Sequence, residues 1–424
     1  MKSPLGRSAR SPAVSVAFFL LAAAVASAQV PAPAAIADQA LFDPGPGAYF
    51  TYRIPAAVAT RPGHVVFFCE GRKGSASDFT ATDLLVLRSP DGGRTWTKPQ
   101  VVWSEGVLAD KITIGNPCPV YDAETGRLWC SFTRENQQVY VTSSADDGET
   151  WSRPQEITAQ VRPFNWTRYW TGPGHGLQLA HGPHRGRLLM PSYHLALESV
   201  DGGDTTTTQA RSHMVYSDDH GQSWHIGGST ELSPKIDRSG SQFEGAWVPG
   251  AATWQGEECM AAEVSDGGLY LIVRNEADRA DHFDKKKTFA WSRDAGLTWT
   301  PLTFQPQLPD PGCESSLISL AAVGLGPDTF LFAGITRDHL EQNGVSKHAR
   351  HRLAAFLSSD GCRNWHEVGV IQPSYAAYSD LVALTDGTIL CFYDGAAVAG
   401  VPNRTIRWAR FDRDWLRRSP AQAR

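Results

Sequence analysis

The sequence predicts an all-β fold, a six-bladed β-propeller with four antiparallel strands in each blade. Two observations predict it: one short motif recurs along the chain, and a strand–turn–strand pattern precedes each copy. The motif is S-x-D-x-G-x-T-W, an Asp box, and its copies lie at 89–96, 144–151, 217–224, 292–299 and, in a degenerate form, 358–365. A period of roughly 55–75 residues, with each unit built of strands joined by turns, is typical of propellers.

Each residue type of the box has a local structural role. Asp accepts hydrogen bonds from backbone N–H groups across a tight turn, Gly adopts a positive φ, and Trp packs under the hairpin. The fifth copy lacks Gly at the usual place, where Cys362 stands. We therefore interpret the box aspartates as architectural rather than catalytic.

Six predicted hairpins precede the boxes in chain order. Each consists of two apolar runs bounded by Gly, Asp or Pro turns, which is the strand–turn–strand signal. They span 54–69, 117–132, 176–190, 259–273, 315–332 and 379–393. The strands that lead from the first five hairpins into the boxes are 84–88, 139–142, 214–216, 288–291 and 353–357, and 405–415 looks like a decayed sixth box. About 65 residues per blade leave little room for a second domain.

We expect residues 1–28 to be a cleaved signal peptide and residues 29–424 to form the propeller domain. A basic segment (2–10) is followed by an apolar run (13–25) and a small-residue cleavage site (26–28). The apolar run is too short to span a bilayer comfortably, and no later run approaches that length. We therefore expect a secreted or periplasmic protein without a membrane span.

The composition argues against several other classes of function. The net charge is −5 and the basic residues are dispersed, so no nucleic-acid partner is expected. The seven cysteines form no C-x-x-C motif, and an odd number in an exported chain leaves at least one unpaired. Buried free thiols are our expectation, with a Cys118–Cys130 disulfide as the alternative. The histidines show no metal-ligand spacing, so we expect no bound metal.

Blade topology places the candidate functional residues on one rim. The start of the first strand, the end of the second and the start of the third share that rim, whereas the box lies on the opposite one. The polar residues at these positions are Arg53, Glu70, Arg72, Asp78, Asn116, Arg134, His175, Tyr193, His194, Glu258, Arg274, Glu314, Arg337, Arg350, Tyr378 and Asp394. Arginines from separate blades on such a rim indicate an anionic ligand.

These residues fall in motifs that occur in a recognisable order. The motifs are Y-R-I-P at 52–55, F-C-E-G-R-K at 68–73, the boxes, E-C-M-A-A-E-V at 258–264 followed by R-N at 274–275, R-H-R-L at 350–353 and A-Y-S-D-L at 377–381. With this ordered set, the sequence resembles the exo-α-sialidase (neuraminidase) family over essentially the whole mature chain. The resemblance implies a glycoside hydrolase that removes terminal α-linked sialic acids from glycoproteins, glycolipids and oligosaccharides. It also implies that the anomeric configuration is retained and that no cofactor is needed. We expect a monomer.

The resemblance also implies roles for single residues. Three arginines clamp the substrate carboxylate in this family, which here would be Arg53, Arg274 and Arg350. A tyrosine nucleophile with a glutamate as its base matches Tyr378 and Glu258.

An aspartate in the loop after the first hairpin serves the family as acid/base catalyst. Asp78 is the best match, and Asp83 is the alternative. The other expected site residues are Arg72 and Asn116 for substrate binding, and Glu70 and Asp394 as supporting residues. Relatives typically carry Glu at the position of Asp394 to orient the first arginine, and Asp is one methylene shorter, which puts that contact in doubt.

The chemistry of a sialoside explains these residue types. Its carboxylate is attached to the anomeric carbon, and planar guanidinium groups bind a carboxylate bidentately at any working pH. A carboxylate nucleophile would approach against that charge, whereas a phenol starts neutral and needs a base because its pKa is about 10. An aspartic acid can protonate the leaving oxygen and later deprotonate water.

Several alternatives stay open at the level of sequence. Glu257 competes with Glu258 and Arg352 with Arg350, while Tyr378 taken alone fits a packing role. Trp166 and Trp170 are rim candidates for sugar contacts. The same fold acting on a related nonulosonic acid, or transferring the sugar, is the close functional alternative, and a catalytically silent propeller that binds glycans or proteins is the distant one.

Overall fold

The computed structural model describes Met1 and residues 37–42, 49–199, 206–231, 256–275, 286–342, 345–396 and 405–417. The chain divides into two units, Met1–Ala34 and Ala35–Arg424, and every secondary-structure element described below belongs to the second. Apart from Met1, the expected signal peptide lies outside the described residues, so it stays a prediction. Within the described ranges, no helix is long and apolar enough to cross a membrane.

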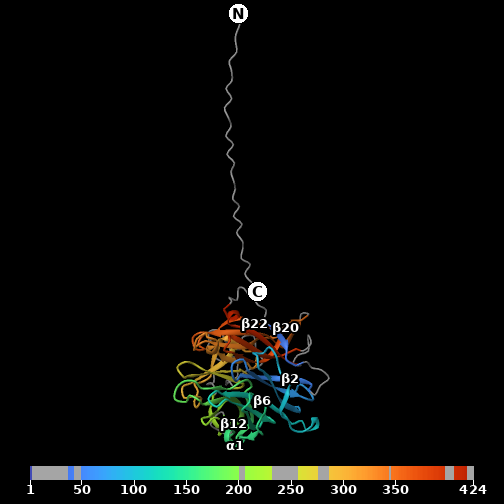
Figure 1. Cartoon of the computed structure of the whole chain (residues 1–424). Helices are drawn as coiled ribbons and strands as arrows, with labels where there is room; N and C mark the ends of the chain where they lie inside the picture. Colours follow the sequence, from blue (N-terminus) through green and yellow to red (C-terminus); the bar gives the residue numbers. More distant parts are fainter. Residues whose placement is uncertain are drawn as a thin grey trace. The chain divides into compact units, whose positions relative to one another are not determined.

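The described part of the chain is all-β (Figure 1). The first sheet has the order β2 (Thr51–Ala59), β3 (Val65–Arg72), β4 (Thr82–Ser89) and β5 (Gln100–Trp103). The second has β6 (Ile114–Asp122), β7 (Arg127–Arg134), β8 (Gln138–Ser144) and β9 (Gln155–Glu156). The third has β10 (Trp166–Thr171), β12 (Leu188–Ser199), β13 (Thr206–Ser217) and β14 (His225–Ser229), with β11 (Leu177–Gln178) paired to β12. The fourth has β15 (Cys259–Glu263), β16 (Leu269–Val273), β17 (Lys286–Ser292) and β18 (Thr303–Pro309).

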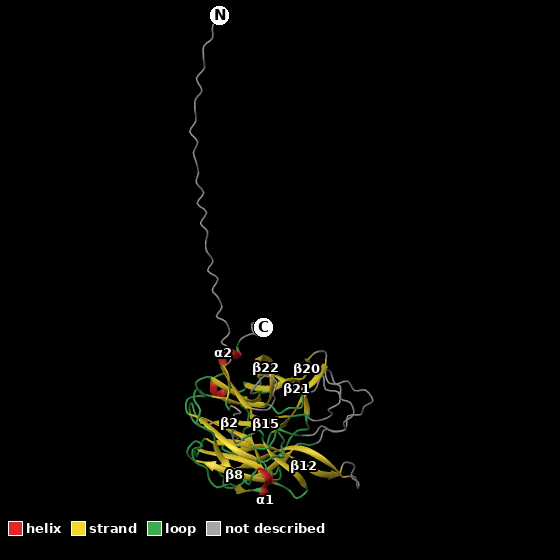
Figure 2. Ribbon diagram, turned by 90° about the vertical axis from the view of Figure 1, so that its right-hand side faces the viewer, coloured by secondary structure: helices red, strands yellow, loops and turns green. Residues whose placement is uncertain are grey.

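A seven-stranded sheet follows in the chain. Its order is β19 (Ser316–Ser319), β20 (Phe330–Gln342), β21 (Val345–Ser358), β22 (His366–Ala383), β23 (Thr388–Gly395), β24 (Thr405–Asp412) and β1 (Ala37–Ala40). The helical elements are short: α1 (Thr158–Val161), α2 (Arg413–Leu416) and the 3-10 turns Leu108–Asp110 and Ala321–Val323 (Figure 2).

The sheets are arranged as a β-propeller. Strands β2, β6, β12, β15 and β19 contact one another in that order, and β2 also contacts β22 and β23 of the last sheet, which closes the ring. The apolar core lies between neighbouring sheets, as where Phe67 of β3 packs on Phe392 of β23 with ring centroids 4.7 Å apart. The predicted all-β propeller arrangement is therefore confirmed.

The fifth and sixth blades, predicted as separate units, are not separate in the structure. Four separate four-strand paths match predicted blades, but the fifth and sixth predicted units form one sheet. The reason is β22, which pairs with β21 through residues 366–375 and with β23 through residues 376–383. The connection between the two units is extended throughout, so a single 18-residue strand serves both.

The boxes have the predicted architectural role. In the first box, the carboxylate of Asp91 accepts hydrogen bonds from the backbone N–H and the hydroxyl of Thr95 at 2.8 and 2.7 Å. In the fifth box Asn364 makes the matching contacts to Asp360 at 2.9 and 2.7 Å. Cys362 takes the place of Gly with φ 64°, a conformation that L-residues rarely adopt.

The box tryptophans pack more widely than predicted, because they also contact the neighbouring sheet. Trp151 packs on Phe68 of the first sheet with ring centroids 5.4 Å apart. Trp224 packs on Trp129 of the second sheet at 5.8 Å. The seven cysteines are all buried and free, which confirms the expected thiols; Cys118 and Cys130 form no disulfide.

Candidate active site

A pocket of about 380 Å³ gathers the predicted site residues. Its lining residues are Arg53, Ile54, Glu70, Arg72, Asp78, Phe79, Asn116, Asn136, Trp170, Tyr193, Glu257, Glu258, Arg274, Arg350 and Tyr378. Every predicted site residue except Asp394 is among them. The residues come from strands of the first three sheets and the seven-stranded one, their loops, and the chain just before β15 and just after β16 of the fourth, so the pocket forms where the inner strands converge.

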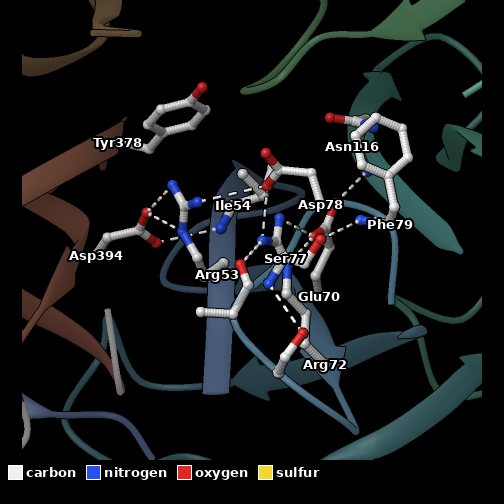
Figure 3. Close-up of polar contacts among 12 residues, drawn as sticks. Arg53, Ile54, Glu70, Arg72, Ser77, Asp78, Phe79, Asn116, Tyr378 and Asp394 are labelled. Atoms are coloured by element: carbon white, nitrogen blue, oxygen red, sulfur yellow. Dashed lines mark hydrogen bonds and ion pairs between the residues drawn. The ribbon is translucent and has the colours of Figure 1, made fainter. Parts of the chain in front are cut away.

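Arg53 is held on β2 by the buried carboxylate of Asp394 on β23 (Figure 3). One oxygen of Asp394 accepts from Nε and Nη2 of Arg53 at 2.9 and 2.8 Å, and the other accepts from the N–H of Ile54 at 3.2 Å. Ile54 has φ 61° at an irregularity in the β2–β3 register, which turns its N–H toward Asp394. The shorter aspartate side chain therefore does reach the arginine.

Glu70 and Arg72 form a second buried pair, at the end of β3. Glu70 accepts from Nε of Arg72 at 2.8 Å with one oxygen and from the backbone N–H of Asn116 at 2.9 Å with the other. Nη1 of Arg72 donates to the carbonyl of Ala76 at 2.6 Å and lies 2.7 Å from Asp78. Arg72 is only 2% exposed, and its contacts with Ala76 and Asp78 position the loop that carries Asp78. This positioning role adds to the predicted contact with substrate.

Asp78 presents its carboxylate to the pocket. Its side chain is 66% exposed and lies 2.7 Å from Arg72 and 3.6 Å from Arg53. Partial burial raises the pKa of Asp78, but the guanidinium groups of Arg72 and Arg53 lower it more, so the net shift is downward.

The alternative Asp83 faces elsewhere. It is buried, accepts a hydrogen bond from the Tyr49 hydroxyl at 2.8 Å and pairs with Nζ of Lys73 at 2.8 Å. Asp83 does not line the pocket. The geometry therefore favours Asp78 as the candidate acid/base.

Tyr378 on β22 is joined to Glu258 and Arg274 at one side of the pocket. Its hydroxyl donates a short hydrogen bond to one oxygen of Glu258 and accepts from Nη1 of Arg274 at 2.9 Å. The same Nη1 donates to the other oxygen of Glu258 at 2.7 Å. Burial, followed by the Glu258 carboxylate, raises the pKa of Tyr378 well above its usual value against the opposing effect of the three arginines. The phenol is thus protonated at rest and has a proton acceptor in place.

The three predicted arginines surround the ring of Tyr378. The guanidinium carbons of Arg53 and Arg350 lie 5.0 and 5.5 Å from its centroid, and Nη2 of Arg350 donates to the carbonyl of Gly312 at 2.6 Å. Arg352, the alternative to Arg350, points elsewhere and pairs with Glu367 at 2.7 Å. Arg53 on β2, Arg350 on β21 and Arg274 directly after β16 place three cations around one phenol, which suits a carboxylate ligand.

Asn116 and Glu257 complete the polar lining. Asn116 has φ 58°, and its side-chain amide donates to Asn136 at 3.2 Å and Thr133 at 3.3 Å. Glu257 lies 3.2 Å from Nε of Arg274, so it shares the pocket with Glu258, but the phenol hydroxyl of Tyr378 donates to Glu258. The contact favours Glu258 over Glu257 as the base.

Sequence reasoning missed or misplaced some residues. Trp170 does line the pocket, stacked on Tyr193 with ring centroids 4.6 Å apart, but Trp166 is buried against His194. Phe79 and Asn136 were not predicted; the apolar Phe79 in a polar loop directly after Asp78 was a signal that could have found it.

Other rim candidates lie outside the pocket. They are Arg134, His175, His194, Glu314 and Arg337. His175 lines a separate cavity of about 490 Å³, and its Nδ1 is 2.7 Å from the buried Asp380. In the ranges that the structure describes, no group of three His, Cys, Asp or Glu side chains is placed to hold a metal ion.

Comparison with known proteins shows the family of the chain. A family model described as a BNR repeat-like domain matches residues 64–391. A sialidase of Micromonospora viridifaciens is 30% identical over 94% of this chain. The chain belongs to the sialidase family with BNR, or Asp-box, repeats. It spans 59% of the length of the Micromonospora relative.

Solved structures of the family share the fold. The Hadza microbial sialidase Hz136 matches with a TM-score of 0.68 at 22% identity, covering 87% of this sialidase-family chain and 66% of that structure. The intramolecular trans-sialidase of Ruminococcus gnavus, in complex with oseltamivir carboxylate, matches with a TM-score of 0.66 at 18% identity, covering 89% and 98% respectively. At these identities the similarity supports the propeller fold only. The reaction must be inferred from the residues of the pocket.

Proposed function

We propose that this sialidase-family protein is an exo-α-sialidase that hydrolyses terminal α-linked sialic acids of glycoproteins, glycolipids and oligosaccharides with retention of configuration. The observation that carries the proposal is the Tyr378 phenol, hydrogen-bonded to Glu258 and surrounded by three arginines. Sialidases with a Tyr nucleophile are a known exception to the two-carboxylate scheme of glycosidases.

Substrate binding would begin with the carboxylate of the sialic acid. Arg53, Arg274 and Arg350 supply the guanidinium groups that bind it, and Asp394 fixes Arg53 before the substrate arrives. Pre-orientation of a binding group reduces the ordering cost of association. Because this carboxylate is attached to the anomeric carbon, its binding places that carbon beside the Tyr378 hydroxyl.

In the first chemical step, Glu258 accepts the phenolic proton of Tyr378 and the phenolate oxygen attacks the anomeric carbon. The glycosidic C–O bond breaks, and protonated Asp78 donates its proton to the leaving oxygen. The nearby arginines stabilise the charge that develops on the phenolate. The products of this step are the free aglycone and a sialyl group bound covalently to Tyr378.

The second step reverses the roles. The Asp78 carboxylate removes a proton from water, whose oxygen attacks the anomeric carbon, and the bond to Tyr378 breaks. Glu258 returns its proton to the phenolate oxygen. Two inversions give net retention and leave Asp78 protonated for the next cycle.

We also propose that the propeller has six blades, with β22 contributing to two. One apolar cluster joins Leu331 and Leu353 of β20 and β21 to Leu381 and Ile389 of β22 and β23, which is face-to-face packing between the two halves of the seven-stranded sheet. In this assignment β19–β22 form the fifth blade, and β22–β24 with β1 form the sixth.

Release of 4-methylumbelliferone from its α-sialoside tests the proposed function. The wild-type protein should release it, the Tyr378→Phe variant should lose nearly all activity, and the control Tyr140→Phe, changed outside the pocket, should keep it. Undiminished activity in Tyr378→Phe would contradict the nucleophile. No release by the wild type would favour a related nonulosonic acid or a silent binder, and NMR of the product separates hydrolysis from transfer.

A further inference from the structure

Phe79 lies beside the candidate acid/base and is unusually exposed for its size. It follows Asp78 directly in the loop after β3, lines the pocket and is 58% exposed. In Figure 3 its ring lies on the opposite side of Asp78 from Tyr378 and near Asn116. An isolated exposed aromatic on a protein surface needs no explanation, but one that lines a polar pocket does.

The ring is held in place from the third sheet. The guanidinium of Arg168 on β10 lies over the Phe79 ring at 5.6 Å from its centroid, and Nη1 of Arg168 donates to the carbonyl of Glu135 at 3.3 Å. On its own loop, the N–H of Phe79 donates to the Ser77 hydroxyl at 3.2 Å. These contacts orient the aromatic surface without burying it.

We propose that Phe79 forms the binding surface for the sugar residue that leaves, and so helps to determine which sialosides are cleaved. This inference rests on the proposed function, since it takes Asp78 as the group that protonates the leaving oxygen. A leaving sugar must then lie next to Asp78, on the side away from Tyr378. The exposed aromatic surface at that place suits the apolar C–H face of a neutral sugar ring.

The position separates Phe79 from the residues that bind sialic acid itself. The carboxylate-binding arginines surround the ring of Tyr378, whereas Phe79 is oriented by Arg168 and Ser77 beyond Asp78. Loss of Phe79 should therefore affect substrates in proportion to the size of their leaving group.

Two substrates with different leaving groups test this. In 3′-sialyllactose the leaving group is a disaccharide, whereas in α-sialyl fluoride it is one atom, too small to reach an aromatic ring beyond Asp78. In Phe79→Ala, the ratio of kcat/KM for sialyllactose to that for sialyl fluoride should fall about 2- to 12-fold, as expected for the loss of one aromatic contact. Phe79→Trp should keep the wild-type ratio, as should Phe164→Ala, a change of an exposed phenylalanine outside the pocket.

An unchanged ratio in Phe79→Ala would overturn the assignment, whether the activity is retained or falls equally on both substrates. Because Phe79 is 58% exposed, Phe79→Ala should keep the thermal melt of the wild type, and a shift in that melt would reveal misfolding. If the wild type cleaves neither substrate, the proposed function itself fails and this assignment falls with it. Cleavage by the wild type with no change of ratio removes only the role of Phe79.

Discussion

Asp394 accepts two hydrogen bonds from the guanidinium of Arg53, at 2.9 and 2.8 Å. The pair lies where β2 of the first sheet meets β23 of the last and the ring of sheets closes. Asp394 is fully buried and Arg53 is only 8% exposed. Burial raises the pKa of Asp394 above its usual value despite the opposing charge of Arg53. The pair therefore links β2 of the first sheet to β23 of the last and also orients Arg53, the proposed substrate-binding residue.

Replacing Asp394 should affect both stability and binding. Asp394→Ala leaves Arg53 without its buried anion and with only the exposed Asp78 carboxylate nearby, and breaking a buried pair in this way costs about 3–5 kcal/mol of unfolding free energy. KM should also rise, because Arg53 loses its orientation. Urea denaturation and steady-state kinetics measure the two effects. Asp394→Glu keeps the charge and should lose less; unchanged stability in Asp394→Ala would refute the linking role.

Glu258 is predicted to act as the base for Tyr378. Glu258→Gln keeps the shape of the side chain but removes the proton acceptor, so kcat should fall roughly 10²–10⁴-fold. The matched control is Glu257→Gln, which alters a neighbouring carboxylate that also contacts Arg274 but not the phenol. Initial rates on a sialoside compare the two. A larger loss in Glu257→Gln would reassign the base.

The pH dependence should report the environment of Asp78. Arg72 and Arg53 lower the pKa of Asp78 in the free protein, so the acid form is lost as pH rises through a low value, and kcat/KM should fall with it. Arg72→Gln removes one positive charge, which raises the pKa of Asp78 and moves this alkaline limb to higher pH. Arg72→Lys keeps the charge and should leave the limb near its wild-type position. A limb that does not move in Arg72→Gln would mean that another group controls it.

The N-terminal strand should contribute to stability through Asp38. Its carboxylate accepts from the Tyr393 hydroxyl at 2.6 Å, from Nε of Arg407 at 2.9 Å and from Nε2 of Gln372 at 3.1 Å. Asp38→Ala should therefore cost about 1–2 kcal/mol of unfolding free energy in urea. Asp414→Ala, which removes an exposed ion pair with Arg417, is the control and should change little. Equal stability of the two variants would show that β1 is not held through Asp38.

The repeated elements of the fold could be predicted because their signals are local. Each box encodes its own turn, and Asp91 and Thr95 make in the structure the contacts that their spacing indicates. The continuity of β22 and the pairing of β1 with β24 could not be predicted, because both depend on partners far away in the sequence.

In the candidate site, too, local signals could be predicted and long-range contacts could not. Ordered motifs and strand ends brought Arg53, Glu258 and Tyr378 onto one rim, and the structure places them in one pocket. Sequence order could not show that His194 would be buried beside His213, because side-chain orientation depends on packing between strands. The motifs did favour Asp78 over Asp83, but the contacts that hold Asp83 away from the pocket, with Tyr49 and Lys73, could not be read from the sequence.

Trapping of the covalent intermediate tests the central claim most directly. The protein would be incubated with 2,3-difluorosialic acid, a fluorinated sialic acid that reacts with the nucleophile but is released slowly, and then analysed by intact-mass and peptide mass spectrometry. The account predicts one fluorosialyl group per chain, located on Tyr378, and none on Tyr378→Phe. A label on another residue, or turnover of a sialoside without any trapped adduct in the wild type, would contradict Tyr378 as the nucleophile.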